Sequence, residues 1–515
     1  MLRKNAVNRD IPDSIDNREL HPFAGAFNTN PIGKRKFAPK LSISKPNNDK
    51  LCKTVRDALE KAQVRDGMTI SFHHHLREGD AVVNMVIEEI AKMGIKNITI
   101  FPTALFAVHD KLIEFVKSGV ISKIEGSLNG PIGKFVSYGN MKNTCVLRSH
   151  GGRVRAIESG DMKIDIAFIA SPTADEFGNC SGLYGKSACG PLAYADIDSR
   201  YAEHVIVITD NLVKYPLVPH SIPSTRVDTV VKVDSIGDPA LIVTGTMRIT
   251  KSPTRLLIAK YSVDFLDKIG YIKNEMNFQT GAGGISLAVT KFMADKMREK
   301  NVKAKFINGG ITKYAVEMLK EGLTDSLIDV QSFDLEAIES MRSDKNHFEC
   351  TVDEYANYFS KGCLVDKLDV GFLGATEVDV NFNVNVNTHS DGLLLHGIGG
   401  HQDVAAGCDI TMITIPAYRN RLPIIMDSVT TVTTPGETVD VIVTEMGIAI
   451  NPLRTDLIEK AKNIKSIPIM PIHEMKNKIE KITGKMEKPE KKDRIVALIE
   501  YRDGTIIDVV REVAL

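Results

Sequence analysis

The feature that most constrains this 515-residue sequence is an internal repeat, because three segments of its first half recur in the same order in its second half. The matching pairs are residues 71–101 with 277–307, KIDIAFIA at 163–170 with KLDVGFLG at 367–374, and the glycine-rich residues 181–195 with 390–406. Any two α/β domains share some alternation of strands, turns and helices in their sequences. Three matched segments at nearly constant spacing nevertheless favour duplication of one fold.

The repeated segments alternate between strand and helix patterns. MTISFH at 68–73 reads as an apolar strand, residues 81–94 have the spacing of a helix, and IKNITIF at 95–101 reads as a strand again. Strands that alternate with helices of this length predict βαβ units and a largely parallel sheet. The predicted fold class is therefore α/β, with two duplicated, open and largely parallel domains.

Local composition places the domain boundaries. Residues 1–50 are rich in Pro, Asn, Lys and Arg and have no sustained periodicity, so we expect an extended N-terminal arm over the body or a neighbouring subunit. The remaining chain exceeds what one hydrophobic core usually serves, which predicts a first domain over 51–240 and a second over 241–515. The boundary falls within 216–250, where PLVPHSIPSTR supplies three prolines.

Charge and cysteine content exclude several classes of function. Lys and Arg total 65, as do Asp and Glu, so nothing in the charge suggests a nucleic acid or an anionic membrane as partner. The seven cysteines form no CxxC pair, which favours reduced thiols in a cytoplasmic protein.

The first residues lack the apolar core of a signal peptide, and no run of about 18 apolar residues predicts a membrane span. No HExxH or finger-like Cys/His spacing suggests a metal site.

A carboxylate distinguishes the second half of the repeat from the first. Glu377 lies just past a predicted buried strand and stands opposite Thr173, at the end of a strand where open α/β sheets bind ligands. Such a carboxylate can attack an acyl carbon, forming an anhydride and then a glutamyl thioester. The alternative is a solvated loop glutamate.

Two glycine turns are further candidates for chemistry. TGAGG at 280–284 opens a helix, so its N–H groups can approach an anion. HGIGGHQD at 396–403 can supply N–H donors to an oxyanion or make room for a thioester. Each motif is weak by itself, since a tight turn would explain it equally well.

Clustered cationic and imidazole groups in the first half could bind a polycarboxylate, since Arg can bind carboxylates in a bidentate way. They come from HHHLREGD at 73–80 and SHGGRVR at 149–155, and the candidates are His73, His74, His75, Arg77, His150 and Arg153. Alternate side chains of the histidine run must face opposite ways, so one of them can simply be buried.

Several of these stretches match a known family. FQTGAGGISLAV, GATEVDVNFNVN, HGIGGHQDVAAG and VTEMGIAINPLR resemble the C-terminal half of the acyl-CoA:carboxylate CoA-transferases, including the 4-hydroxybutyrate type. A closer resemblance, along residues 10–515, is to the α subunits of citrate lyase, and it includes SFHHHLREGDAVVNMV, GDMKIDIAFIASPTADEFGNCSG and ITDNLVKYP.

This resemblance implies a CoA-transferase-type fold with the active site in the crevice between the two domains. It implies an enzyme that exchanges acetate for citrate on a CoA-type thioester. In the family the thiol belongs to a CoA-derived prosthetic group on an acyl-carrier (γ) subunit, free acetyl-CoA can replace it, and a lyase (β) subunit cleaves the citryl product. Homo-oligomers are also expected from the family.

The resemblance further assigns roles to residues of this sequence. Glu377 matches the catalytic glutamate of the covalent CoA-transferases, and Gly399 and Gly400 match the glycine loop of their active site. Gly281, Gly283 and Gly284 match their glycine turn on the CoA side. Whether Glu377 is acylated or only orients substrates stays open, as does which His and Arg side chains bind citrate. The alternatives are a covalent CoA-transferase or acyl-CoA hydrolase for another acid, and a non-catalytic scaffold that docks the carrier and lyase subunits.

Overall fold

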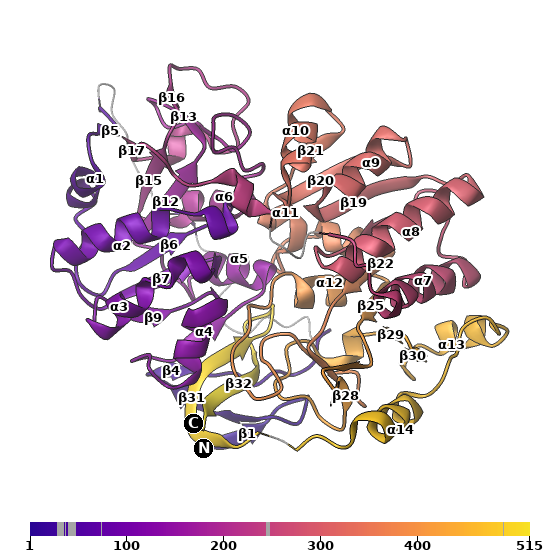
Figure 1. The fold of residues 1–515 in the computed structure, drawn as a ribbon. Coiled ribbons are helices and arrows are strands. Elements are labelled where there is room, and N and C mark those ends of the chain that lie inside the picture. The colour runs from indigo at the N-terminus through magenta and orange to yellow at the C-terminus, as the bar shows by residue number, and fades with distance from the viewer. Residues whose placement is uncertain are drawn as a thin grey trace.

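The structure is a computed structural model of the chain. It describes residues 1–27, 36, 38–39, 48–73, 75–243, 248–487 and 489–514. Two large sheets stand side by side, one in each half of the chain, with the strand hairpin of the C-terminus below and between them (Figure 1).

The sheet of the first half has seven strands, and every pairing in it is parallel. Its spatial order is β5 (Leu51–Cys52), β17 (Thr229–Lys232), β15 (His204–Thr209), β12 (Ile166–Ser171), β6 (Thr69–Phe72), β7 (Ile98–Pro102) and β9 (Ile121–Ile124). The central strands are buried on both faces, as expected for a parallel sheet that helices cover.

The sheet of the second half has eight strands, and only its last pairing is antiparallel. Its spatial order is β21 (His347–Glu349), β20 (Thr324–Ser332), β19 (Ala304–Ile311), β18 (Asn277–Gln279), β22 (Val370–Leu373), β25 (Ile410–Thr414), β29 (Val441–Thr444) and β30 (Gly447–Ile450). Read from β29 to β20, this order repeats that of the first sheet from β17 to β9. The prediction of a duplicated, largely parallel α/β fold is confirmed.

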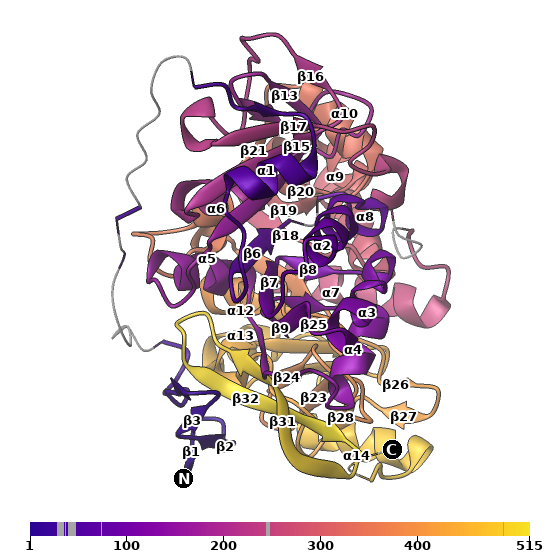
Figure 2. The ribbon, with the colours of Figure 1, turned by 90° about the vertical axis from the view of Figure 1, so that its left-hand side faces the viewer.

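Helices cover the faces of both sheets (Figures 1 and 2). In the first half they are α1 (Val55–Lys61), α2 (Val82–Lys92), α3 (Leu112–Lys117), α4 (Gly130–Ser137), α5 (His150–Glu158) and α6 (Ala193–Tyr201). In the second half they are α7 (Pro253–Lys268), α8 (Gly284–Lys300), α9 (Lys313–Lys320), α10 (Leu335–Ser343), α11 (Val352–Ala356), α12 (His401–Gly407), α13 (Thr455–Ala461) and α14 (Ile472–Thr483). In α2 the predicted periodicity is realised, since Val82, Val83, Val86, Ile87 and Ile90 are all buried on one face.

Both ends of the chain lie at the lower end of the molecule, on opposite sides of it in Figure 2 (Figures 1 and 2). The C-terminal hairpin, β31 (Lys491–Glu500) and β32 (Ile506–Val513), pairs in parallel with β11 (Cys145–Leu147) of the first half. The first residues form two short hairpins, β1 (Leu2–Lys4) with β2 (Asp10–Pro12) and β3 (Ser14–Ile15) with β4 (Arg18–Glu19). They pack against the C-terminal hairpin of their own chain, where the Asn5 side chain donates to the Ile507 carbonyl at 2.7 Å.

The halves share a buried contact that holds the crevice walls in place. One apolar cluster contains Phe101, Val154 and Tyr194 of the first half and Val330 and Tyr355 of the second. Beside it, Glu500 of β31 accepts from Arg148 and Arg155 at 2.8 and 2.7 Å. Burial alone would raise the pKa of Glu500, but Arg148, Arg18 and Arg155 hold it well below its usual range. None of the helices in the described ranges combines the length and apolar character that a membrane span requires.

Candidate active site

A cavity of about 580 Å³ lies between the two halves. The first half contributes Arg77, Phe106, Ser127, His150 and Tyr194 to its wall, and the second contributes Gln279, Gly281, Phe333, Tyr355, Gly399 and Gly400. We refer to this cavity as the crevice. The structure thus brings together one predicted arginine, one predicted histidine and residues of both glycine turns.

Arg77 is the cation of the crevice. Its backbone is left-handed, with φ of +53°, in the turn after β6. Its guanidinium carbon lies 5.3 Å from the centre of the Phe106 ring and 5.1 Å from that of Phe333, so one aromatic side chain from each half flanks it. Burial lowers the pKa of Arg77, and its Nε is buried without a hydrogen-bond partner among the described residues. Glu78 also lines the crevice and its charge acts on Arg77, but among the described residues no carboxylate forms an ion pair with this half-buried guanidinium. It can therefore bind an anion.

His150 and Tyr194 form the wall beside Arg77. His150 begins α5, where the Ser149 hydroxyl accepts from the Gly152 N–H at 2.9 Å and caps the helix. The His150 Nε2 and Tyr194 hydroxyl lie 3.2 Å apart. Burial, with a further contribution from Arg153, lowers the pKa of His150 to about 4, so the imidazole is neutral at pH 7. Burial raises the pKa of Tyr194 far above neutrality, which leaves its hydroxyl protonated.

The glycine loop before α12 lies against this wall, because the His150 N–H donates to the Gly399 carbonyl at 2.9 Å. Gly399 has φ of +64°, a conformation that favours glycine. A Cβ on Gly400 would lie 2.7 Å from the Tyr355 hydroxyl. The N–H groups of both glycines find no acceptor among the described residues, and both glycines line the crevice. They can therefore donate to an oxyanion of a bound substrate.

The second glycine turn opens α8 between two cavities. Gly281 lines the crevice, whereas Gly283 and Gly284 line an adjoining cavity of about 510 Å³. We refer to this as the second cavity. A Cβ on Gly283 would meet nothing within 4 Å, and one on Gly281 would make an ordinary 3.4 Å contact with Ser286. Local packing therefore accounts for neither glycine, while close approach of a ligand would.

Glu377 does not lie with the glycine turns. It begins β23 (Glu377–Asp379), is fully buried and lines neither cavity. Its Oε2 accepts from the Asn385 side chain at 2.9 Å and from the Thr430 N–H at 2.7 Å, and its Oε1 accepts from the Thr430 hydroxyl at 3.0 Å. Ala375 and Thr376 line the second cavity just before it, but the Glu377 side chain is held in this buried network. A carboxylate held in this way is not presented to an acyl group in the crevice.

Three of the predicted substrate-binding side chains lie behind the crevice wall rather than on it. His73, His75 and Arg153 are buried, and none of them lines the cavity. Arg153 donates to both oxygens of Asp198 at 2.7 and 2.8 Å, so its charge is already neutralised. Burial lowers the pKa of His73 to about 3, and burial followed by the neighbouring His73 lowers that of His75. His74 lies outside the described residues.

Sequence reasoning missed several residues of the site. The Gln279 amide donates to the Tyr355 hydroxyl at 2.9 Å in the crevice wall, and Phe333 flanks Arg77. Asp403 accepts from the Ser149 hydroxyl at 2.9 Å and from the Gly151 N–H at 3.0 Å, which joins α12 to the start of α5. Burial raises the pKa of Asp403 to about 6. Gln279 directly precedes one glycine turn, and Asp403 is the last residue of the other glycine motif. These positions in the sequence could have indicated both residues.

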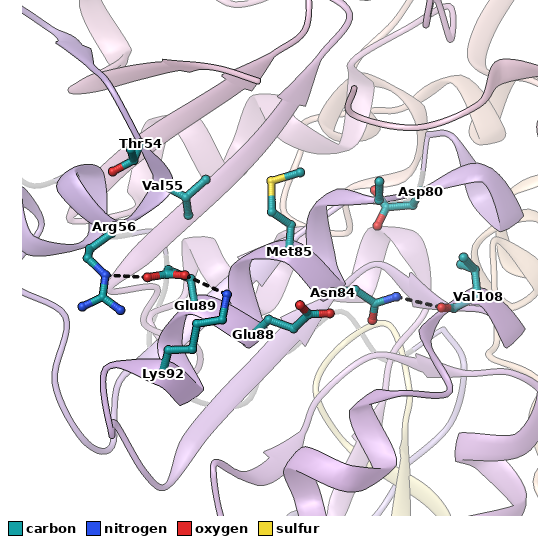
Figure 3. A pocket seen from close by; sticks show the side chains of 11 residues that line it. Thr54, Val55, Arg56, Asp80, Asn84, Met85, Glu88, Glu89, Lys92 and Val108 are labelled. Atoms are coloured by element: carbon teal, nitrogen blue, oxygen red, sulfur yellow. Dashed lines mark hydrogen bonds and ion pairs between the residues drawn. The ribbon is translucent and has the colours of Figure 1, made fainter. Parts of the chain in front are cut away.

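Another cavity of the first half lacks these features. It is an open groove beside α1 and α2 (Figure 3), where Arg56 donates to Glu89 at 2.6 Å and Lys92 to the same carboxylate at 3.3 Å. Both of these cations of the groove thus share the carboxylate of Glu89. The described residues contain no group of three or more His, Cys, Asp or Glu side chains arranged to hold a metal ion.

Known proteins are similar to this sequence over most of its length. The family model described as citrate lyase, alpha subunit (CitF) matches residues 48–513. The citrate lyase alpha chain of Klebsiella pneumoniae is 44% identical over 495 residues, which is 96% of each chain. That of Escherichia coli is 44% identical over 470 residues, covering 91% of this chain and 92% of the relative.

Solved structures extend the comparison to the fold. A putative alpha subunit of citrate lyase from Streptococcus mutans, in complex with citrate, has a TM-score of 0.95 and 47% identity, covering 99% of this chain and all of that one. The 4-hydroxybutyrate CoA-transferase of Porphyromonas gingivalis has a TM-score of 0.55 at 17% identity over 84% of this chain and 97% of that one, a likeness of fold alone. The chain belongs to the citrate lyase alpha-subunit family.

Proposed function

We propose that this chain exchanges acetate for citrate on a CoA-type thioester and thereby forms a citryl thioester. The observation that carries the proposal is the crevice. Arg77, which forms no ion pair with a described carboxylate, lines the same space as Gly399 and Gly400, whose N–H groups find no acceptor among the described residues. Membership of the citrate lyase alpha-subunit family, and the likeness to a structure in complex with citrate, support citrate as the acid.

The proposed reaction needs no acylated residue. A carboxylate oxygen of citrate attacks the acetyl carbonyl carbon, the C–S bond breaks, and the products are a mixed acetyl–citryl anhydride and a thiolate. The thiolate then attacks the citryl carbonyl carbon, and acetate leaves with the bridging oxygen. One negative charge passes through both steps and no net proton is transferred. The protein must hold the two acyl groups together, which can lower the barrier by about 7–11 kcal/mol.

Each wall of the crevice has a role in this scheme. Arg77 binds a carboxylate of citrate, which its bidentate donors suit. The N–H groups of Gly399 and Gly400 stabilise the oxyanion at about 3–4 kcal/mol per donor. With the proton of the neutral His150 on Nε2, the Tyr194 hydroxyl accepts from His150 and donates its own proton to a second substrate oxygen. The turn at Gly281, Gly283 and Gly284 accommodates the thioester arm.

We assign Glu377 a positioning role. Its carboxylate accepts hydrogen bonds from β24 (Val384–Asn385) and from the loop at Thr430. It thereby holds β23 in place directly after Ala375 and Thr376, which line the second cavity. We assign a supporting role also to His75, whose ring centre lies 6.0 Å from that of Tyr194, and to His73, whose ring centre lies 5.5 Å from that of His75. Arg153 is held by Asp198 behind the same wall.

The same family membership supports the wider assembly that we propose. The natural thioester is carried by a CoA-derived prosthetic group on an acyl-carrier subunit, and a lyase subunit cleaves the citryl product. We also propose a cytoplasmic, homo-oligomeric enzyme, in keeping with seven cysteines that are all free thiols.

The test is citryl-CoA formation by the purified chain from acetyl-CoA and citrate, followed by chromatography. Arg77→Gln is expected to lower kcat/KM for citrate about 100-fold or more, the scale of losing a charged, bidentate contact. Arg56→Gln serves as the control, because Arg56 lies in the groove of Figure 3 and is paired with Glu89. Absence of citryl-CoA with the wild type, or equal rates for the two variants, would overturn the proposal.

A further inference from the structure

The second cavity gathers positive groups from three separate elements. Arg255 lies in the first turn of α7, Arg419 lies in β26 (Tyr418–Arg419), and Gly283, Gly284 and Ser286 belong to the amino end of α8. All of these residues line the same space of about 510 Å³.

No described group neutralises this concentration of charge. Arg419 donates one bond, at 2.7 Å, to the Ala375 carbonyl. Arg255 and Arg419 are both exposed to solvent. Partial desolvation lowers the pKa of Arg419, and the positive charge of Arg255 lowers it further. Among the described residues, no carboxylate forms an ion pair with either guanidinium. Like charges held together in this way repel each other, and a bound anion would relieve the repulsion.

The two helices add to the positive field. α7 has 16 residues and α8 has 17, and they pack against each other. Neither has an acidic residue in its first turn or a side-chain cap at its amino end. The amino end of a helix carries a partial positive charge, so Arg255 stands where a cation is electrostatically disfavoured. An anion placed between the guanidinium groups and the start of α8 would also meet the uncapped N–H groups there.

The second cavity adjoins the crevice. Leu395, His396, Ile398 and His401 line both spaces, and the glycine turn at 280–284 lies between them. One extended ligand can therefore have its reacting end near Arg77 and a distant anionic group in the second cavity. The His401 side chain is not a further cation, because burial lowers its pKa to about 4.

We propose that Arg255, Arg419 and the amino end of α8 bind the phosphate groups of the thioester substrate, between its pantetheine arm and its nucleotide. This inference rests on the proposed function and names the part of the substrate that the second cavity recognises. Arginine suits phosphate because its planar fork donates two parallel hydrogen bonds. The two cavities thus bind different anions: citrate at Arg77 in the crevice, and phosphate at Arg255 and Arg419 in the second cavity.

The experiment compares two thioesters that differ in phosphate. The double variant R255Q/R419Q and the wild type are assayed with acetyl-CoA and with acetyl-pantetheine, at saturating citrate. The variant is expected to lose about 10- to 100-fold in kcat/KM for acetyl-CoA, from the loss of two charged contacts. With acetyl-pantetheine, which has no phosphate, the loss is expected to stay below about threefold, since only remote effects remain.

Arg421→Gln provides the control, because Arg421 lies in the turn of the same hairpin but does not line the cavity. A loss that is equal for the two thioesters, or a raised KM for citrate in place of acetyl-CoA, would overturn the phosphate assignment and leave the proposed function intact. If the wild type forms no citryl-CoA, the proposed function fails. Calorimetric titration with CoA then still tests the subsite, since the double variant should bind CoA at least tenfold more weakly, and equal affinity would refute it.

Discussion

The Glu377→Gln substitution separates a positioning role from a nucleophilic one. The carboxylate is fully buried and accepts three hydrogen bonds, two at Oε2 from the Asn385 and Thr430 nitrogen donors and one at Oε1 from the Thr430 hydroxyl. In a glutamine, the amide oxygen can keep the two bonds at the Oε2 position. The amide nitrogen can donate to the Thr430 hydroxyl, which then acts as acceptor.

The expected change in the free energy of unfolding follows from these three hydrogen bonds. The amide keeps the three contacts and loses only their charge assistance, which amounts to about 1–2 kcal/mol in total. Glu377→Ala, in contrast, removes the acceptor of the Thr430 N–H and hydroxyl and one acceptor of the Asn385 amide, which keeps its bonds to Thr388. It should cost about 3–5 kcal/mol. The two variants should therefore differ in the free energy of unfolding by at least about 1 kcal/mol, measured by urea denaturation.

Activity decides between the roles. If Glu377 only positions β23 and the Thr430 loop, folded Glu377→Gln forms citryl-CoA within about threefold of the wild-type rate. If the carboxylate is acylated, the rate falls by about 100-fold or more while the variant remains folded, and a borohydride-sensitive thioester accumulates on the wild type. That result would refute the reasoning. Glu321→Gln, an exposed glutamate paired with Arg298, is the control for a generic loss of carboxylate.

Three further predictions concern the crevice wall. Tyr194→Phe removes the hydroxyl beside His150 and should lower kcat about tenfold with a smaller change in KM for acetyl-CoA; unchanged steady-state kinetics would remove Tyr194 from the mechanism. Gly399→Ala forces a Cβ onto a backbone with φ of +64° and should cost about 1 kcal/mol in urea denaturation, together with a loss of citryl-CoA formation; full stability would contradict the strain. Burial raises the pKa of Asp403 from 3.8 to about 6, so the folded state holds its proton more tightly than the unfolded state. Its stabilising contribution is therefore complete below pH ~4 and is lost as the pH rises through 6, by at most about 3 kcal/mol; Asp403→Asn should remove this slope, and parallel stability profiles would refute it.

The fold could be predicted because its signals are local or repeated. Alternating strand and helix patterns, as in residues 68–101, fix the type of each element from neighbouring residues. The matched segments then indicated two copies, and the shared strand order bears this out. The pairing of β31 with β11 could not be foreseen, because it joins residues about 350 positions apart and depends on tertiary packing.

The site could be predicted only in part, for a related reason. Arg77 and the two glycine turns lie at strand-to-helix turns, where local sequence indicates both exposure and backbone freedom. Whether a side chain at the end of a strand faces a cavity or the interior depends on the layer that packs on it. Glu377 meets Thr430, which lies 53 residues further on, and Arg153 meets Asp198, which lies 45 further on. Neither partner is visible in the local pattern, so the carboxylate and the guanidinium both appeared available when they are held by buried partners.

The central claim, direct transfer between citrate and the acetyl thioester in the crevice, is tested most directly by oxygen labelling in a single turnover. Excess enzyme is mixed with acetyl-CoA and citrate that carries ¹⁸O in its carboxylates, and the released acetate is analysed by mass spectrometry. Direct attack predicts acetate with one ¹⁸O atom, because the bridging oxygen of the mixed anhydride comes from citrate. Unlabelled acetate would mean that the oxygen came from a protein carboxylate or from water, and it would contradict the account.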